Sequence, residues 1–213
     1  MDNLLAGLRR YTEKIYPKQK EMFDGLARGQ KPHTLFVTCS DSRIDPNLIT
    51  QTNPGELFVL RNPGNMVPTF GSSGGGEEAA VEFAVRFLGV RNIVVCGHSK
   101  CGAVGAMLDS RPLAELPATR TWLNHAADTK QKMARGDSPG DVRVCTEMNV
   151  LAQIENLRSH PSVSERLSEG TLDIFGWIYH FERGTVSVYH GGQGRFVPFT
   201  EITDSQLAGQ LKN

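Results

Sequence analysis

The segment from Leu4 to Arg28 carries apolar residues at helical spacing. Its apolar positions are Leu4, Leu5, Leu8, Tyr11, Ile15, Met22, Phe23 and Leu26. Side chains that recur about every three to four residues share one face of a helix, and Pro17 interrupts the pattern, so we expect two helices. The first helix would bury little surface alone. We therefore expect residues 1–30 to form a helical arm that docks onto a second copy of the chain.

After the arm, short apolar runs predict buried strands, because continuous apolar residues suit a strand that is covered on both faces. The runs are Leu35–Thr38, Leu57–Leu60 and Asn92–Cys96. Alternation of apolar and polar residues predicts two further strands that turn at Arg183 and Gly184. These are Leu172–His180 and Thr185–His190.

Helical patterns separate these strands. They span Glu77–Leu88, Ala103–Leu108 and Val142–Leu157, with a last short helix expected at Asp204–Leu211. Strands that alternate with helices predict an α/β fold whose central sheet is mostly parallel and flanked by helices. The closing pair of strands adds an antiparallel edge. We expect residues 1–213 to form a single domain with ligands at the carboxyl ends of the strands.

Charge and cysteine content narrow the function classes. The 213 residues include 23 Lys plus Arg and 23 Asp plus Glu, so the formal net charge is zero. Basic residues are scattered, which argues against nucleic acid or a membrane surface as partner. No apolar stretch is long enough to cross a membrane. The 4 cysteines do not resemble a secreted disulfide framework, and we expect a cytoplasmic protein.

Chemically reactive residues follow two of the predicted strands. Cys39 comes directly after the first, while His98 and Cys101 follow the third. Two thiolates and an imidazole suit zinc, which prefers sulfur and nitrogen ligands in a tetrahedron. Three protein ligands leave one position open, which is typical of catalytic rather than structural sites. A cysteine at a strand end and a His-x-x-Cys pair are each common alone. Their joint occurrence after two separate strands indicates a zinc site.

Two charged residues lie beside the predicted zinc ligand Cys39. Asp41 and Arg43 are two positions apart, and in an extended stretch such residues face the same way. An ordinary ion pair that holds a loop is one interpretation. Beside a metal, Arg43 would also keep Asp41 ionised, and Asp41 would accept the proton of a water or hydroxide and orient its lone pair.

Two further cysteines and a glycine-rich segment are weaker candidates for a functional site. Cys96 lies inside a strand pattern and Cys145 inside a helix pattern, so both are expected to be inert. The glycine-rich segment from Gly71 to Gly76 lacks the Lys-Ser/Thr ending of a phosphate-binding loop, so we exclude nucleotide binding there.

The two loops resemble a known family. Cys39-Ser40-Asp41-Ser42-Arg43 and Gly97-His98-Ser99-Lys100-Cys101-Gly102 are similar to the C-S-D-S-R and G-H-x-x-C-G signatures of β-class carbonic anhydrases. The resemblance continues through Pro54–Val59, Arg61–Asn65 and Ala79–Phe83, and it covers most of the chain. It implies a lyase that reversibly hydrates carbon dioxide to bicarbonate by attack of zinc-bound hydroxide. It also implies a homodimer or an assembly of dimers.

The resemblance also assigns roles to residues. Cys39, His98 and Cys101 match the ligands of one zinc ion per chain, and Asp41 and Arg43 match the catalytic dyad. The residues that match substrate-binding positions are Gln30, which reaches across the dimer interface, Phe58, Phe83, where many relatives have tyrosine, and Gly102, whose backbone N–H can meet the substrate.

The family has an open state and a closed state. In the closed state the residue that matches Asp41 becomes a fourth zinc ligand. Bicarbonate-regulated members often carry tryptophan three residues before the first cysteine, where this chain has Phe36. We therefore expect the open state at neutral pH, with Asp41 as a conditional ligand.

Two alternative functions remain at this point. One is a hydrolase of carbon disulfide or carbonyl sulfide that uses the same zinc site. The other is a non-catalytic zinc-binding assembly protein, against which the Asp41–Arg43 pair argues, because a structural zinc needs a fourth protein ligand.

Overall fold

The computed structural model describes the chain apart from residues 73–74, 110, 128, 132–139 and 204–213. The helix expected at Asp204–Leu211 lies outside the described residues. The chain divides into two compact units, Met1–Lys31 and Pro32–Asn213. The expectation that residues 1–213 form one domain stays a prediction, and each unit is described by itself.

The N-terminal unit is helical from Asp2 to Leu26. It consists of α1 (Asp2–Arg10), a π-helical segment η1 (Tyr11–Ile15) and α2 (Tyr16–Leu26). Pro17 does not end the helix as expected: it lies in the first turn of α2, directly after the π-helical segment η1, where the hydrogen-bond pattern changes from π to α. Apolar side chains of α1 are exposed, with Leu4 at 73% and Leu8 at 60%.

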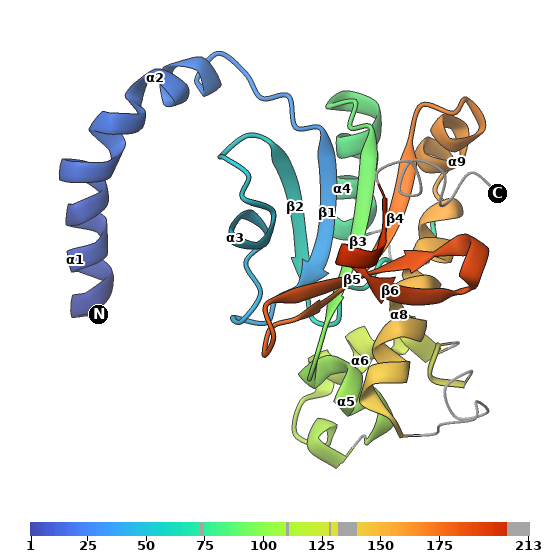
Figure 1. The fold of residues 1–213 in the computed structure, drawn as a ribbon. Coiled ribbons are helices and arrows are strands. Elements are labelled where there is room, and N and C mark those ends of the chain that lie inside the picture. The colour runs from blue at the N-terminus through green and yellow to red at the C-terminus, as the bar shows by residue number, and fades with distance from the viewer. Residues whose placement is uncertain (73–74, 110, 128, 132–139, 204–213) are drawn as a thin grey trace. The chain divides into compact units, whose positions relative to one another are not determined.

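The second unit is built on a six-stranded sheet in the order β2-β1-β3-β4-β5-β6 (Figure 1). The first four of these are parallel, and β5 pairs antiparallel with β4, as predicted. A further strand, β6, pairs antiparallel with β5. The strands are β1 (Thr34–Cys39), β2 (Leu57–Asn62), β3 (Asn92–His98), β4 (Asp173–His180), β5 (Thr185–His190) and β6 (Arg195–Pro198). The sequence pattern did not predict β6.

Helices connect and cover the strands. They are α3 (Pro46–Thr50), α4 (Gly76–Glu82), α5 (Gly102–Leu108), α6 (Pro117–Leu123), α8 (Val142–Arg158) and α9 (Pro161–Ser168). Shorter segments are the π-helical η2 (Phe83–Phe87) and the 3₁₀ turns η3 (Arg111–Leu113), η4 (Asn124–Ala126), η5 (Gly191–Gln193) and η6 (Phe199–Glu201). Among the described residues, we find no helix that is both long and apolar enough to cross a bilayer.

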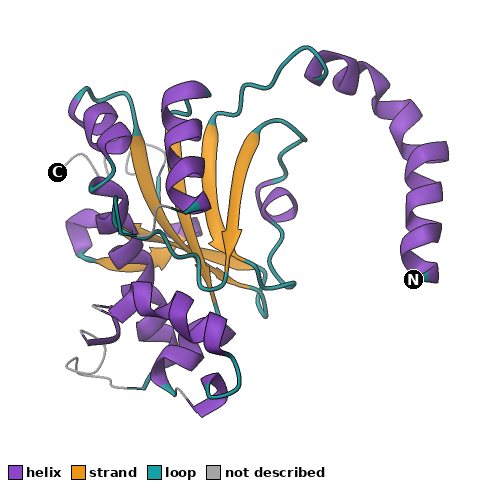
Figure 2. Cartoon of the chain, turned by 180° about the vertical axis from the view of Figure 1, so that it is seen from behind, coloured by secondary structure: helices purple, strands orange, loops and turns teal. Residues whose placement is uncertain are grey.

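The two faces of the sheet carry different cores. On one face, Leu35 and Val37 pack with apolar residues of α4, α8 and α9, and Figure 2 shows helices in front of this face. On the other face, Phe36 packs with Val94 and with the half-buried Trp177. Successive side chains of a strand point to opposite faces, so one apolar run supplies both cores.

One strand differs from its predicted burial. We expected Leu57–Leu60 to be as buried as the other runs, but β2 is an edge strand and is largely half-exposed. Val59 is 37% exposed. A strand at the edge of a sheet has a neighbour on one side only, so part of its surface stays uncovered.

Candidate metal centre

The strand order brings the two reactive loops together. From β1 the chain moves to β2 on one side, and from β3 it moves to β4 on the other side. Crevices at such a reversal of strand order are where open α/β sheets bind ligands. Cys39 ends β1 and His98 ends β3, and these strands are neighbours with Thr38 opposite Cys96. Cys101 precedes α5 as its N-cap residue.

The three predicted ligand residues form one buried cluster. The ligand atoms of Cys39, His98 and Cys101 all lie within 4.8 Å of one another, and the two sulfurs are 3.9 Å apart. His98 Nδ1 lies 2.9 Å from the carbonyl oxygen of Ser99. That contact fits an Nδ1–H donor, which leaves the Nε2 lone pair free.

These residues fit a tetrahedral metal ion. An ion about 2.3 Å from each of two tetrahedral sulfur ligands sets the sulfurs about 3.8 Å apart, close to the separation seen between Cys39 and Cys101. The cysteines are free thiols rather than a disulfide. His98 Nε2 is buried and has no hydrogen-bond partner among the residues that the structure describes. A bound cation would satisfy this nitrogen, which is otherwise costly to bury.

The protein alone already favours a thiolate at this site. The hydrogen bond from Cys101, and a smaller effect of His98, lower the pKa of Cys39 to about 4. The same hydrogen bond to Cys39, followed by burial, raises the pKa of Cys101. Two adjacent thiols therefore hold one negative charge easily and a second only with difficulty. A cation between them would deprotonate both.

Neighbouring groups fix the position of Cys39. The backbone N–H of Gly64 donates to Cys39 Sγ at 3.3 Å. Arg61 donates from Nε to the Cys39 carbonyl at 3.1 Å and from Nη2 to the Asp41 carbonyl at 2.8 Å. Arg61 and Gly64, which belong to the family motif Arg61–Asn65, therefore hold the loop that carries Cys39 Sγ. Neither periodicity nor spacing in the sequence predicts these contacts.

The backbone of Gly64 has no space for a side chain. Its φ is +83°, and an added Cβ would lie 2.9 Å from Met66 Cε and 3.3 Å from Ala103 Cβ. Glycine is the residue that adopts such a conformation without strain. The close approach of the Gly64 backbone to Cys39 therefore depends on this residue type.

Asp41 and Arg43 pair beside the cluster, by a different geometry from the one we expected. The segment is a turn, not an extended stretch, and the backbone N–H of Arg43 donates to Asp41 Oδ1 at 3.0 Å. Short aspartate side chains commonly close turns in this way. The guanidinium adds two more bonds, Nε to Oδ1 at 2.9 Å and Nη2 to Oδ2 at 2.7 Å.

The dyad lies at the edge of the metal cluster. Asp41 Oδ2 is 3.8 Å from His98 Nε2. The side-chain hydrogen bonds from Arg43 hold the pKa of Asp41 well below its usual range. Arg43 also donates from Nη2 to the Lys100 carbonyl at 3.1 Å, which connects the two signature loops.

The predicted substrate residues do not all gather at this cluster within one chain. Phe58 pairs with Leu35, whereas Cys39 pairs with Asn62, so Phe58 lies four residues, or about 13 Å, from the level of the site. The Phe83 ring is 5.9 Å from that of Phe58 and is 41% exposed. The structure therefore places both rings away from the cluster of their own chain.

The structure places Gly102 next to the metal cluster but does not place Gln30 relative to it. Gly102 is the first residue of α5 and directly follows Cys101, so its backbone does lie at the cluster. Gln30 belongs to the N-terminal unit, and its place at the site stays a prediction.

The remaining cysteines have surroundings that suppress reactivity. Burial raises the pKa of Cys96 to about 12, and its thiol lies inside β3 on the sheet face that carries Phe36. Burial also raises the pKa of Cys145, which packs in the apolar cluster that contains Cys39 and Cys101. Both surroundings suit protonated thiols, in agreement with the expectation from sequence.

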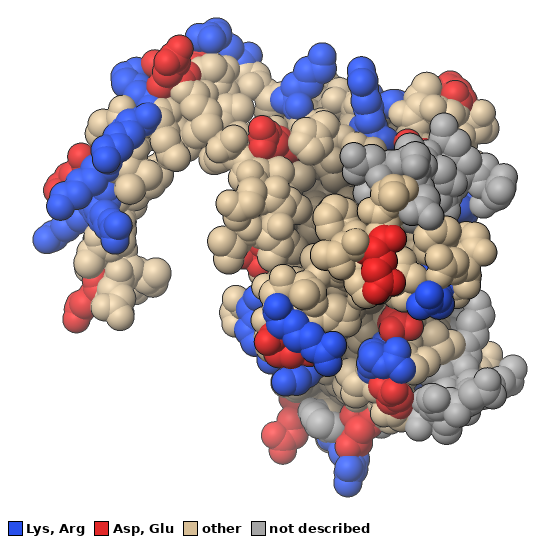
Figure 3. All heavy atoms as spheres, viewed as in Figure 1, with Lys and Arg blue, Asp and Glu red and all other residues tan. Residues whose placement is uncertain are grey.

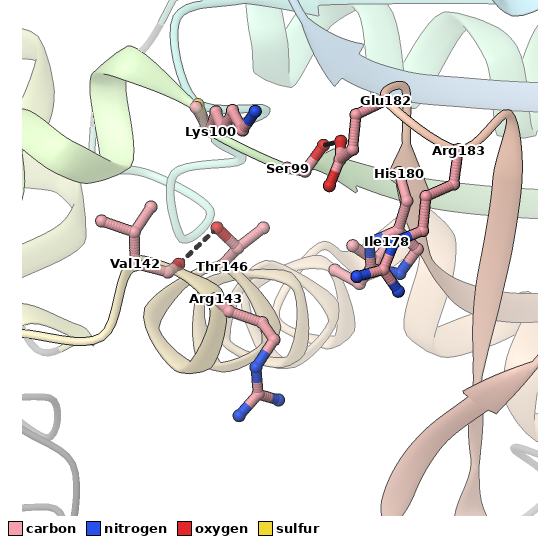
Figure 4. Close-up of a pocket in the computed structure, with 10 residues that line it drawn as sticks. Ser99, Lys100, Val142, Arg143, Thr146, Ile178, His180, Glu182 and Arg183 are labelled. Carbon is pink, nitrogen blue, oxygen red and sulfur yellow. Dashed lines mark hydrogen bonds between the residues drawn. The ribbon is translucent and has the colours of Figure 1, made fainter.

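A pocket of about 430 Å³ opens behind the His98–Cys101 loop (Figure 4). Its walls come from that loop, from the start of α8 and from the end of β4 with the turn that follows. The hydroxyl of Ser99 donates to Glu182 Oε2 at 2.5 Å across this pocket. The lining residues are Ser99, Lys100, Cys101, Val142, Arg143, Thr146, Ile178, His180, Glu182 and Arg183.

Charge on the visible surface is mixed rather than segregated. Figure 3 shows basic and acidic side chains interspersed over the described part of the second unit on the face that it draws. This distribution lacks the single-sign field that binding to a phosphate backbone uses. It agrees with the formal net charge of zero.

Comparisons with known proteins bear directly on this site. The family model for carbonic anhydrase matches residues 34–186, which include both signature loops. A carbonic anhydrase of Synechococcus elongatus is 47% identical over 191 residues, which cover 87% of this chain and 70% of that protein. A carbonic anhydrase of Pseudomonas aeruginosa is 42% identical over 212 residues, which cover 98% of this chain and 96% of that protein.

A solved structure agrees with these relatives. The β-carbonic anhydrase CcaA superposes with a TM-score of 0.89 at 40% identity, over 93% of this chain and 98% of that one. These similarities favour carbon dioxide hydration over the hydrolysis of carbonyl sulfide and over a non-catalytic role. This chain belongs to the β-class carbonic anhydrases, lyases that reversibly hydrate carbon dioxide.

Proposed function

We propose that Cys39, His98 and Cys101 hold one zinc ion per chain and that carbon dioxide is hydrated at this ion. The observation that supports this most is the buried Nε2 of His98, which no described residue hydrogen-bonds, in one cluster with two sulfurs 3.9 Å apart. Soft sulfur and imidazole ligands select zinc over the hard cations. When bound, zinc lowers the pKa of a coordinated water and so supplies a nucleophile near neutral pH.

The dyad would orient the reaction. The Asp41 carboxylate is ionised and lies at the rim of the cluster, where it can accept a hydrogen bond from the reacting water and direct the oxygen lone pair toward carbon dioxide. Arg43 holds that carboxylate through two side-chain bonds. We propose that the site is in the open state at neutral pH, and the hydrogen bonds of Arg43 to Asp41 support this. We propose that the backbone N–H of Gly102 meets the substrate, which the position of Gly102 directly after Cys101 supports.

Metal analysis joined to kinetics tests this proposal. We expect the purified protein to carry close to one zinc per chain and to hydrate carbon dioxide in a stopped-flow assay. Dialysis against a chelator should remove both zinc and activity, and restored zinc should restore activity. A protein that hydrates carbon dioxide after complete zinc removal would contradict the proposal.

We also propose that the active unit is a homodimer or an assembly of dimers. Phe58 lies about 13 Å from the level of the cluster of its own chain, and the Phe83 ring lies 5.9 Å from the Phe58 ring, which supports a carbon dioxide pocket formed by these rings at the site of a second copy. The apolar side chains of α1 are exposed, as expected for a surface that a partner covers. In the same arrangement Gln30 would reach the partner's site.

Light scattering tests the assembly. Leu8→Glu places a charge on the exposed apolar face of α1 and should shift the measured mass toward the monomer. Arg10→Gln, on the same helix, should leave the mass unchanged. Equal masses for both variants and the wild type would exclude the arm from the interface.

We propose a cytoplasmic location on chemical grounds. All four cysteines are buried free thiols, and the site needs two of them as thiolates. Thiols persist in this form in a reducing compartment.

A further inference from the structure

The turn that joins β4 to β5 is held against the metal-binding loop. This turn, residues 181–184, is closed by the backbone N–H of Arg183, which donates to the His180 carbonyl at 3.0 Å. The turn is fixed to Ser99 by the Ser99 hydroxyl, which donates to Glu182. Just before the turn, the backbone N–H of Ser99 donates to the carbonyl of Tyr179 in β4 at 2.9 Å. Figure 4 shows Ser99 and Glu182 facing each other. The first side chain of the turn is therefore set at a defined place beside the site.

That side chain is Phe181, and its ring lies under the guanidinium of the dyad. The Cζ of Arg43 is 4.5 Å from the ring centroid, and Lys100 Nζ is 5.8 Å from it. The imidazole of His98 lies 6.4 Å from the same centroid. A cation within about 6 Å of a ring face is attracted by the negative charge there. The ring thus contacts the cation of the dyad and borders a proposed metal ligand.

Arg43 needs such support, because its side chain is 45% exposed. Ion pairs in contact with water hold a long side chain weakly, since solvent competes and many rotamers remain open. The Phe181 ring covers one face of the guanidinium, while Asp41 and the Lys100 carbonyl bind its edge. Together these contacts select one arrangement of Arg43, and that arrangement sets where the Asp41 carboxylate lies.

We propose that Phe181 is a positioning residue for carbon dioxide hydration: its ring holds Arg43 so that Asp41 stays beside the metal position rather than in it. The inference rests on the proposed function of the cluster. Asp41 Oδ2 is already only 3.8 Å from His98 Nε2. Without the ring, Arg43 gains freedom, and the carboxylate is released either toward solvent or toward the metal.

Three variants distinguish the effect of the Phe181 ring face on Arg43 from the effect of apolar cover alone. Phe181→Leu keeps an apolar side chain but removes the ring, and we expect kcat/KM to fall about 5-fold, the loss that corresponds to one cation–π contact. Phe181→Tyr keeps the ring and should stay within about twofold of wild type. Phe199→Leu makes the same change at a ring in η6 outside the site and should have no effect.

A spectroscopic readout tests the placement of Arg43 without relying on activity. Nitrogen-15 spectra of arginine side chains, with the Arg43 Nε–H assigned by its loss in Arg43→Lys, can be recorded with and without zinc. In the wild type we expect a signal that is shifted upfield by the ring and exchanges slowly, because this hydrogen binds Asp41 Oδ1. Phe181→Leu should remove the upfield shift and accelerate exchange, and Phe181→Tyr should do neither.

The outcomes distinguish this inference from the function on which it rests. A wild-type protein without zinc would overturn the metal assignment, while the Arg43 signal would still report whether the ring holds the guanidinium. A zinc-loaded Phe181→Leu variant with full activity and an unchanged Arg43 signal would overturn the positioning role. A Phe181→Tyr variant as impaired as Phe181→Leu would do the same.

Discussion

Asp41 Oδ2 lies 3.8 Å from His98 Nε2, although Asp41 follows β1 and His98 ends β3. The carboxylate is near enough to orient a molecule at the metal position, and its hydrogen bonds to Arg43 hold it short of that position. This relationship makes the charge of Asp41 the first feature to test.

Asp41→Asn should lower kcat/KM by about 100-fold or more and leave the zinc content unchanged. The amide keeps the size of the side chain but loses the charge that Arg43 binds and that accepts the proton of the reacting water. Stopped-flow hydration and metal analysis on the same sample measure both effects.

Asp109 provides a matched control for this substitution. Its carboxylate accepts hydrogen bonds from the backbone N–H of Arg111 at 3.1 Å and from the Nε of Arg111 at 2.9 Å, the same pair of bonds as in the dyad, at an exposed position. Asp109→Asn should therefore retain activity. Equal losses in the two variants would mean that the turn, not the metal-side charge, matters.

The acid limb of the pH profile should persist in Asp41→Asn. Arg43 lowers the folded-state pKa of Asp41, so any stability from this pair is present above the unfolded pKa of about 3.9 and is lost as pH falls through the lowered value. The carboxyl is thus ionised throughout the range from about pH 5 to 9. We expect carbon dioxide hydration by the wild type to increase with pH in this range because the proposed zinc-coordinated water, rather than Asp41, loses its proton there.

Profiles of kcat/KM against pH for the two proteins check this. Both should decline on acidification, with the variant lower at every pH. A variant whose profile became flat would assign the acid limb to Asp41 and contradict the direction of its pKa shift.

Cys101→Ser should lose most of its zinc, because a hydroxyl is a much poorer zinc ligand than a thiolate. Cys145→Ser is the control, since Cys145 is equally buried and packs in the same apolar cluster without belonging to the ligand group. Mass spectrometry under native conditions measures zinc per chain. Full zinc occupancy in Cys101→Ser would refute the ligand assignment.

Gly97→Ala should destabilise the protein by about 1–3 kcal/mol and disturb the site, because the added methyl group overpacks a closed interface. An added Cβ would lie 2.9 Å from Val150 Cγ2 and 3.0 Å from Thr146 Cγ2, both on α8. To relieve the contact, β3 must shift next to His98. Urea denaturation measures the loss, and zinc affinity should fall with it.

Gly105→Ala tests whether any added methyl group has this effect. An added Cβ at Gly105 has no atom within 4 Å, and the residue lies inside α5, where alanine is favoured over glycine. This variant should be as stable as the wild type or slightly more stable. A comparable loss at both glycines would exclude the contact with α8 as the cause.

The sequence alone determined the parts of this protein that depend on local pattern. Apolar runs located β1, β2 and β3, and alternation of apolar and polar residues located β4 and β5, so five of the six strands followed from local pattern. The loops of Cys39 and of His98 with Cys101 could be placed at strand ends from the same pattern. Their pairing in the two signatures identified the family.

Only the tertiary structure decided what depends on contacts between distant segments. Because β2 lies on the outer side of β1 and β4 on the outer side of β3, β1 and β3 are neighbours and their ends bring Cys39 beside His98. The pairing of β1 with β2 puts Phe58 far from the cluster of its own chain. Phe181 carries no local signal, since one aromatic residue at a turn is unremarkable in sequence. Its place under Arg43 exists because a hairpin folds back over the loop of Ser99, and packing between remote residues is invisible to any periodicity.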